Sequence, residues 1–112
     1  MLHEESVTFM RDWFHFRGRL YYDDSLDPTR AVLLCSPHPH LGGDMENNVI
    51  VHIAAALGGC GSVVMTFDYA GVGNSEGPWR DEMEQFEFWE SIMDSEDYRF
   101  VVPDAEAAFD HL

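Results

Sequence analysis

Residues 33–44 read Leu33-Leu34-Cys35-Ser36-Pro37-His38-Pro39-His40-Leu41-Gly42-Gly43-Asp44, and they carry the strongest structural signal in the sequence. A short apolar run, residues 31–35, leads into this segment, and such a run is typical of a strand buried on both faces. A turn rich in Pro, His and Gly interrupts the run, and Asp44 then stands where a helix N-cap is expected. The segment therefore predicts a strand, a turn at its carboxyl end and a helix.

The apolar residues after Asp44 recur at helical spacing and predict one buried helix face. The residues of this predicted face are Val49, Ile53 and Leu57, with Ile50 and Ala54 beside them. The pair Gly58-Gly59 predicts the end of the helix, because glycine tolerates positive φ. A second apolar run rich in β-branched residues follows at 62–69. Strand, helix and strand in this order predict a right-handed crossover between parallel strands.

Two segments before this unit alternate apolar and polar residues, at 6–10 and 14–22, and predict half-exposed strands. Gly18 lies inside the second segment, where a glycine indicates a bulge or a close approach of another chain segment. We therefore expect an α/β fold in which antiparallel N-terminal strands precede the parallel βαβ unit.

The last third of the chain is acidic and predicts helices over 82–93 and 105–112, joined by a loop at 94–99. Pro103 suits the first turn of the second helix. We expect one partial domain over 1–112. It divides into N-terminal strands (1–30), a βαβ core (31–77) and an acidic helical region (78–112).

Composition excludes several classes of function. The 112 residues are 46% hydrophobic and carry a formal net charge of −15, from 21 acidic and 6 basic residues. Nucleic acids and anionic membrane surfaces both require clustered Lys and Arg, so neither is an expected partner. Cys35 and Cys60 are too few for a disulfide framework, and we expect Cys35 to be a small core residue. No signal peptide or membrane-length apolar run is visible, which favours a cytoplasmic location.

Gly73-Asn74-Ser75-Glu76-Gly77 matches Gly-x-Ser-x-Gly, the motif that surrounds the nucleophile of many hydrolases. That motif presents its serine only where a strand runs straight into it and a helix begins directly after it. Here the flexible stretch 70–73 precedes the match, and Pro78-Trp79 follows it. We therefore interpret the match as a glycine-rich loop and do not predict Ser75 as a nucleophile.

The two loops together resemble a known family. Pro37-His38-Pro39 followed by Gly42-Gly43, and the later stretch 67–77, resemble the amino-terminal half of α/β-hydrolases. The most similar branch has a first loop of the type His-Pro-His-Pro-x-x-Gly-Gly and a second of the type Asp/Asn-x-Arg-Gly-x-Gly-x-Ser-x-Gly. Two positions depart from these patterns: Ser36 replaces a His, and Ala70 replaces an Arg.

The resemblance implies serine-dependent hydrolysis of ester, amide or related acyl bonds of a small-molecule substrate, without a cofactor. It implies that backbone N–H groups of the first loop stabilise the oxyanion; Pro39 has none, so His40 and Leu41 are the candidates. The other expected loop-shaping residues are His38, Pro39, Gly42 and Gly43 in the first loop, and Asp68, Gly71, Gly73 and Ser75 in the second. The family places the nucleophile on the strand after the next helix, so no triad residue is assigned. We expect the chain alone to be inactive.

Two other interpretations remain open. His38 and His40 have a spacing that suits a metal ion, with Asp44, His52 and Asp68 as further candidate ligands. Alternatively, the chain is a non-catalytic fragment or subunit. Half of a doubly wound sheet leaves one strand edge and apolar helix faces uncovered, so such a piece would bind a partner or itself. Nucleotide binding is not expected, because neither glycine-rich turn has the phosphate-binding pattern.

Overall fold

The computed structural model describes residues 1–41, 43–95 and 99–112. Within them the strands are β1 (Leu2–Arg11), β2 (Phe14–Asp23), β3 (Arg30–Cys35) and β4 (Ser62–Phe67). The helices are α1 (Asn48–Gly59), α2 (Glu82–Ser95) and α3 (Val102–His111), with short 3-10 turns η1 (Pro39–Leu41) and η2 (Arg99–Val101). None of the helices in these described ranges is both long and apolar enough to cross a membrane.

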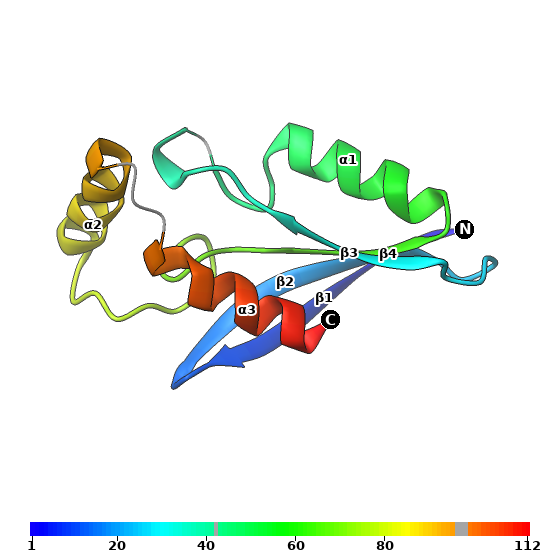
Figure 1. Ribbon diagram of the computed structural model, residues 1–112, viewed down its shortest axis with the longest axis horizontal. Helices are drawn as coiled ribbons and strands as arrows, with labels where there is room; N and C mark the ends of the chain where they lie inside the picture. The colour runs from blue at the N-terminus through cyan, green and yellow to red at the C-terminus, as the bar shows by residue number, and fades with distance from the viewer. Residues whose placement is uncertain (42, 96–98) are drawn as a thin grey trace.

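The strands form a mixed sheet in the order β1-β2-β4-β3 (Figure 1). β1 and β4 each pair with β2 in antiparallel fashion, and β3 pairs with β4 in parallel. The predicted fold class is therefore confirmed. Gly18 continues the β2 ladder without a bulge, and a Cβ there would lie 2.8 Å from the Thr66 carbonyl oxygen. Close approach between strands is thus the reason for this glycine.

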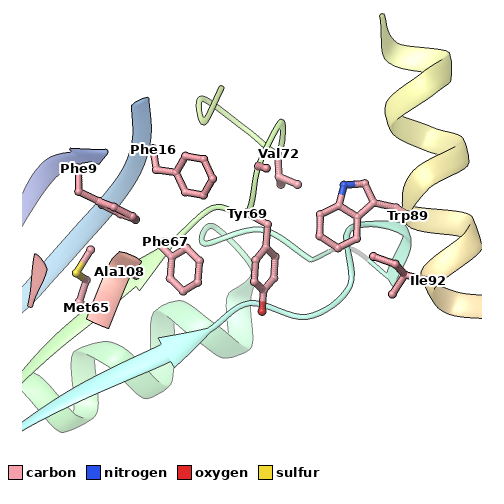
Figure 2. Close-up of a cluster of buried hydrophobic side chains, with 10 residues drawn as sticks. Phe9, Phe16, Met65, Phe67, Tyr69, Val72, Trp89, Ile92 and Ala108 are labelled. Atoms are coloured by element: carbon pink, nitrogen blue, oxygen red, sulfur yellow. The ribbon is translucent and has the colours of Figure 1, made fainter. Parts of the chain in front are cut away.

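Helices cover both faces of the sheet, and the alternation of side chains along the strands explains how. Met65 and Phe67 of β4 face α3 and join the large cluster drawn in Figure 2, which extends to Trp89 and Ile92 of α2. Val64, one residue out of phase with them, faces α1 and packs in a smaller cluster with Tyr21 and Ala54. Because both faces of β4 are buried, its sequence is apolar nearly throughout.

The register of α1 differs from the predicted one. The buried residues are Ile50, Ala54 and Gly58, whereas Val49 and Ile53 are 62% and 41% exposed. All of these residues fit an apolar stripe, and only packing against β2 and β4 selects which edge of the stripe is buried. Val49 and Ile53 therefore form an apolar flank that the described part of the chain leaves uncovered.

The predicted start of α1 is wrong, whereas the helix ends at the predicted glycine pair, although not through a positive φ there. The N-cap is Asn47, whose side chain accepts hydrogen bonds from the N–H groups of Val49 and Ile50. Asp44 instead accepts from Glu46 N in the preceding turn. Gly58 and Gly59 remain helical, and the positive φ of 93° occurs at Gly61. Gly58 is needed for packing, because a Cβ there would lie 3.0 Å from the Leu2 side chain.

We expected Cys35 to be a core residue, and this prediction is wrong. It is exposed at the end of β3, although partial burial raises the pKa of its thiol. In the described sheet β3 has a neighbour, β4, on one side, and the ladder ends at its other edge. The apolar sequence of β3 is typical of a buried strand, but the described residues place no strand along its other edge.

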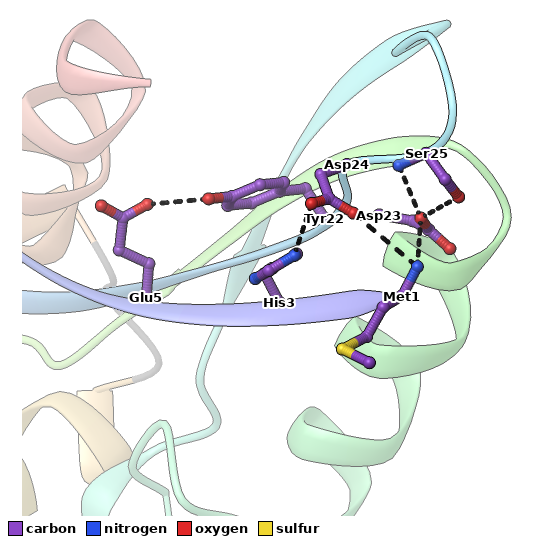
Figure 3. A network of polar contacts seen from close by, with 7 residues as sticks. All are labelled: Met1, His3, Glu5, Tyr22, Asp23, Asp24 and Ser25. Carbon is purple, nitrogen blue, oxygen red and sulfur yellow. Dashed lines mark hydrogen bonds and ion pairs between the residues drawn. The ribbon is translucent and has the colours of Figure 1, made fainter.

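The β1–β2 ladder is closed by charges at the edge of the sheet away from the β3 and β4 carboxyl ends (Figure 3). The Met1 amino group donates to Asp23 Oδ1 at 2.8 Å, and His3 Nε2 lies 2.8 Å from Asp24 Oδ2. Hydrogen bonds from the amino group and Ser25 lower the pKa of Asp23. This network fixes the strand ends but contributes nothing to the candidate site.

Candidate functional site

The loops that follow β3 and β4 meet at one edge of the sheet, because the two strands are parallel neighbours. Ser36 Oγ donates to the carbonyl oxygen of Phe67 at 3.1 Å, which joins the two strand ends. Met45 N donates to Asp68 Oδ1 at 2.8 Å, which joins the two loops. Ser36, the residue that replaces the expected first His, is buried and has this structural contact.

His38 fixes the first loop to α2. Its Nδ1 accepts from His40 N at 3.0 Å, and its Nε2 lies 2.6 Å from the Trp89 carbonyl oxygen. The backbone N–H can only donate and the carbonyl can only accept, so the ring is neutral with its proton on Nε2. His38 is thus positioned as a connector between the loop and α2.

The candidate oxyanion donors both have partners within the loop. His40 N donates to His38 Nδ1, and Leu41 N donates to the His38 carbonyl oxygen at 2.9 Å. In this conformation neither N–H is directed to a substrate. Gly43 is buried against the first loop, where a Cβ would overlap the Pro37 carbonyl oxygen, and Gly42 lies outside the described residues.

The second loop requires its glycines and binds its serine internally. Gly71 and Gly73 have φ of 72° and 55°, and a Cβ on Gly73 would overlap the Asp68 carboxylate. Ser75 Oγ accepts from Arg17 N and donates to the Asp68 carbonyl oxygen, both at 2.9 Å. The hydroxyl is buried, so its geometry is that of a group that holds the loop on β2.

Asp68 is the buried charge that organises both loops. It is 3% exposed, and burial raises its pKa despite the hydrogen bonds from the N–H groups of Met45 and Asn74. The nearby charges of Asp44 and Glu46 act in the same direction as burial. A raised pKa in a cleft is a feature of catalytic groups, but here the oxygen atoms are occupied by backbone donors of the loops.

A second buried carboxylate, Asp104 in the first turn of α3, was not among the predicted site residues. Asp104 Oδ2 accepts from Ala70 N at 3.1 Å, and Oδ1 lies 3.0 Å from Arg11 Nε. The Arg11 pair is an ion pair rather than an aligned hydrogen bond. Burial raises the pKa of Asp104, whereas the Ala70 N–H and Arg11 oppose that shift. The position of Asp104 beside Pro103 at a helix start was the available signal.

The structure does not favour the metal interpretation. Both ring nitrogens of His38 have hydrogen-bond partners, and the His40 ring stacks on Phe86 with centroids 4.2 Å apart. His52 is exposed on α1. Within the described ranges no three His, Cys, Asp or Glu side chains are grouped as metal ligands.

Comparison with known proteins identifies the fold. No family model and no curated protein matches the sequence. Among solved structures, an α/β serine hydrolase homologue from Coxiella burnetii is 24% identical with a TM-score of 0.59, and covers 80% of this chain and 43% of its own. An α/β serine hydrolase without a lid from Xanthomonas campestris is 20% identical with a TM-score of 0.60, over 80% of this chain and 45% of its own.

These similarities show that the chain has the fold of the amino-terminal part of an α/β-hydrolase, as the two loops predicted. The chain spans less than half the length of these two structures. At such identities the similarity concerns the fold, and activity has to be argued from the site.

Proposed function

We propose that this chain forms the amino-terminal half of a serine hydrolase that acts on ester, amide or related acyl bonds without a cofactor, in the cytoplasm. The observation that carries the proposal is the joint edge formed by the loops after β3 and β4, held together through Asp68 and Ser36. In open α/β sheets, binding and catalytic groups gather outside the carboxyl ends of the strands. The structural neighbours with the same fold include α/β serine hydrolases.

In this proposal the first loop supplies the oxyanion N–H, from His40 or Leu41. Both donors are held by His38 in the present conformation, so the turn must open by one hydrogen bond when substrate binds. The exchange is smaller for Leu41, whose N–H leaves one backbone carbonyl oxygen, than for His40, because rotation of the His38 ring would also break its contact with the Trp89 carbonyl oxygen. A donor that becomes free at the developing charge would stabilise the transition state selectively.

The nucleophile, its base and the acid would come from a further segment, which would pack beside β3. The supporting observation is incomplete cover of the helices: Val102 and Phe109 on α3, and Val49 and Ile53 on α1, are large exposed apolar residues. Leu33 of β3 and the α3 residues Val102 and Phe109 line a cavity of about 450 Å³.

A fluorophosphonate probe, which reacts with activated serines, tests this proposal. We expect no labelling of the 112-residue chain, and labelling of a longer product of the same gene in which an apolar strand and Gly-x-Ser-x-Gly follow Leu112. Labelling of Ser75, or a reading frame that does not continue in this way, would contradict the proposal.

The second candidate function is that of a non-catalytic subunit that acts by association. The same exposed apolar residues beside β3 favour it, because large uncovered patches mark interaction surfaces. The continuation of the reading frame separates the two candidates, since a subunit of this kind needs no nucleophile.

A further inference from the structure

A cavity of about 290 Å³ lies between η1, the second loop and α2. It is lined by Pro39 and His40 of η1, by Gly71 of the second loop, and by Phe86 and Trp89 of α2. We call it the aromatic pocket. The aromatic pocket lies at the carboxyl ends of β3 and β4, and His40, one of the candidate oxyanion donors, is part of its lining.

The lining of the aromatic pocket is fixed by two contacts in the first two turns of α2. Gln85 Nε2 donates to the Gly71 carbonyl oxygen at 2.6 Å, and His38 Nε2 is bonded to the Trp89 carbonyl oxygen. The rings of His40 and Phe86 stack at 28°. The pocket therefore exists before a ligand enters, which lowers the entropic cost of binding.

Shape and polarity define the group that fits. A cavity of about 150 Å³ is sufficient for benzene, so the aromatic pocket has room for one ring and a short substituent. The aromatic side chains of Phe86 and Trp89 in the lining favour a planar ring over a branched alkyl group. The indole of Trp89 lines the pocket, and its Nε1 is buried without a hydrogen-bond partner among the described residues.

Charge excludes anionic ligands. Glu82 lies at the pocket, and among the described residues no Lys or Arg side chain lines it. The formal net charge of the whole chain is −15, which adds a long-range repulsion of anions. A carboxylate in the pocket would therefore lose part of its hydration beside the Glu82 carboxylate, without a Lys or Arg partner.

We propose that the aromatic pocket binds an uncharged aromatic group, and that the substrates are neutral aryl or arylalkyl esters or amides. The first part concerns binding by this chain alone, whereas the second rests on the proposed function. The two parts fail separately, because binding to the pocket can be measured without hydrolysis.

The test is an NMR titration of the 112-residue chain at neutral pH with phenylacetamide and with phenylacetate, which share a ring and differ in charge. We expect phenylacetamide to shift the indole N–H signal of Trp89 in a saturable manner, and phenylacetate to bind about tenfold more weakly. The indole signals of Trp13, which is 88% exposed, should not move.

Two variants and one control complete the test. Phe86→Ala, at a half-exposed position, should weaken phenylacetamide binding about tenfold, whereas Phe109→Ala on α3 should leave it unchanged. Glu82→Gln should reduce the difference in affinity between phenylacetamide and phenylacetate. An unshifted Trp89 signal, equal binding of both ligands, or equal effects of the two Phe variants would overturn the proposal. Fluorophosphonate labelling would remain the separate test of hydrolysis.

Discussion

At the scale of single residues, Ser75 shows why a motif needs its context. Its hydroxyl accepts from the Arg17 N–H of β2 and donates to the carbonyl oxygen of Asp68, the residue after β4, so it holds the second loop on β2. A nucleophile needs an accessible oxygen and an adjacent base, and Ser75 is 6% exposed. The sequence context, with flexible residues before the serine and Pro78 after it, already indicated a loop.

Ser75→Ala should therefore destabilise the protein by about 1–3 kcal/mol, because Arg17 N and the Asp68 carbonyl oxygen both lose their partner in a buried place. Urea denaturation followed by circular dichroism measures the change. The control is Ser91→Ala on the exposed side of α2, where we expect a change within about 0.5 kcal/mol. Equal effects of the two variants would show that Ser75 does not hold the loop.

The second prediction concerns the effect of Asp68 on how the stability of the protein depends on pH. Its pKa in the folded state is raised by burial above the ordinary value of 3.8, so the folded state binds the proton more tightly than the unfolded state. Its contribution to stability is therefore greatest below 3.8 and is lost as pH rises through the raised pKa. Asp23 and Glu76, with lowered pKa values, contribute in the opposite direction.

The difference between wild type and Asp68→Asn isolates this effect, because Asn keeps an acceptor for Met45 N but does not titrate. We expect the free energy of unfolding of wild type, relative to the variant, to fall as pH rises from 3 to 7, a window chosen about the ordinary Asp pKa. Asp24→Asn, at an exposed carboxylate, serves as the control. A relative stability that rises with pH would contradict a raised pKa.

At the scale of elements, the sequence predicted which segments form strands and helices better than how they face one another. The βαβ unit and the antiparallel start follow from hydrophobic periodicity, which is a local property. The prediction of which face of α1 is buried was wrong, because Val49 and Ile53 belong to the same wide apolar stripe as Ile50 and Ala54. Only the position of β2 and β4 under the helix distinguishes them, and that is not encoded locally.

The two glycines at the end of α1 have different roles although they are adjacent and both helical. A Cβ on Gly58 would meet Leu2 and the backbone of Tyr21 at 3.0–3.1 Å, whereas a Cβ on Gly59 would meet nothing within 4 Å. Ala is favoured over Gly in a helix by about 1 kcal/mol. That gain is available at Gly59 and is offset by crowding at Gly58.

Gly59→Ala should therefore raise the midpoint of thermal unfolding and Gly58→Ala should lower it, with each change on the order of 0.5–1 kcal/mol. Calorimetry of both variants measures this. Each variant is the control for the other, since the substitution and the helix are identical. A similar shift in both would mean that α1 does not pack on β1 and β2 as described.

At the scale of the whole molecule, the site depends on groups that no local pattern marks. Asp104 and Arg11 lie at opposite ends of the sequence and meet because α3 packs on β1. The resemblance of the two loops predicted the fold and the position of the candidate site. It did not predict the aromatic pocket, since α2 lies outside both loops and its register is set by contacts of His38 and Gln85.

In the described sheet β3 has no neighbouring strand along one edge, and we expect this edge to promote association of the chain. Unpaired strand edges with apolar neighbours promote association, so the apparent mass of the purified chain should increase with concentration in light scattering. Ala31→Lys, at an exposed position of β3, should reduce this increase, because an edge lysine blocks strand addition.

The control is Ser91→Lys at an exposed position of α2, which carries the same charge change and should not reduce the increase in mass. Both substitutions lower the net negative charge, which by itself favours association, so a decrease confined to Ala31→Lys cannot arise from charge repulsion. A monomer at every concentration, or an equal response of the two variants, would show that the β3 edge is not a site of association in this chain.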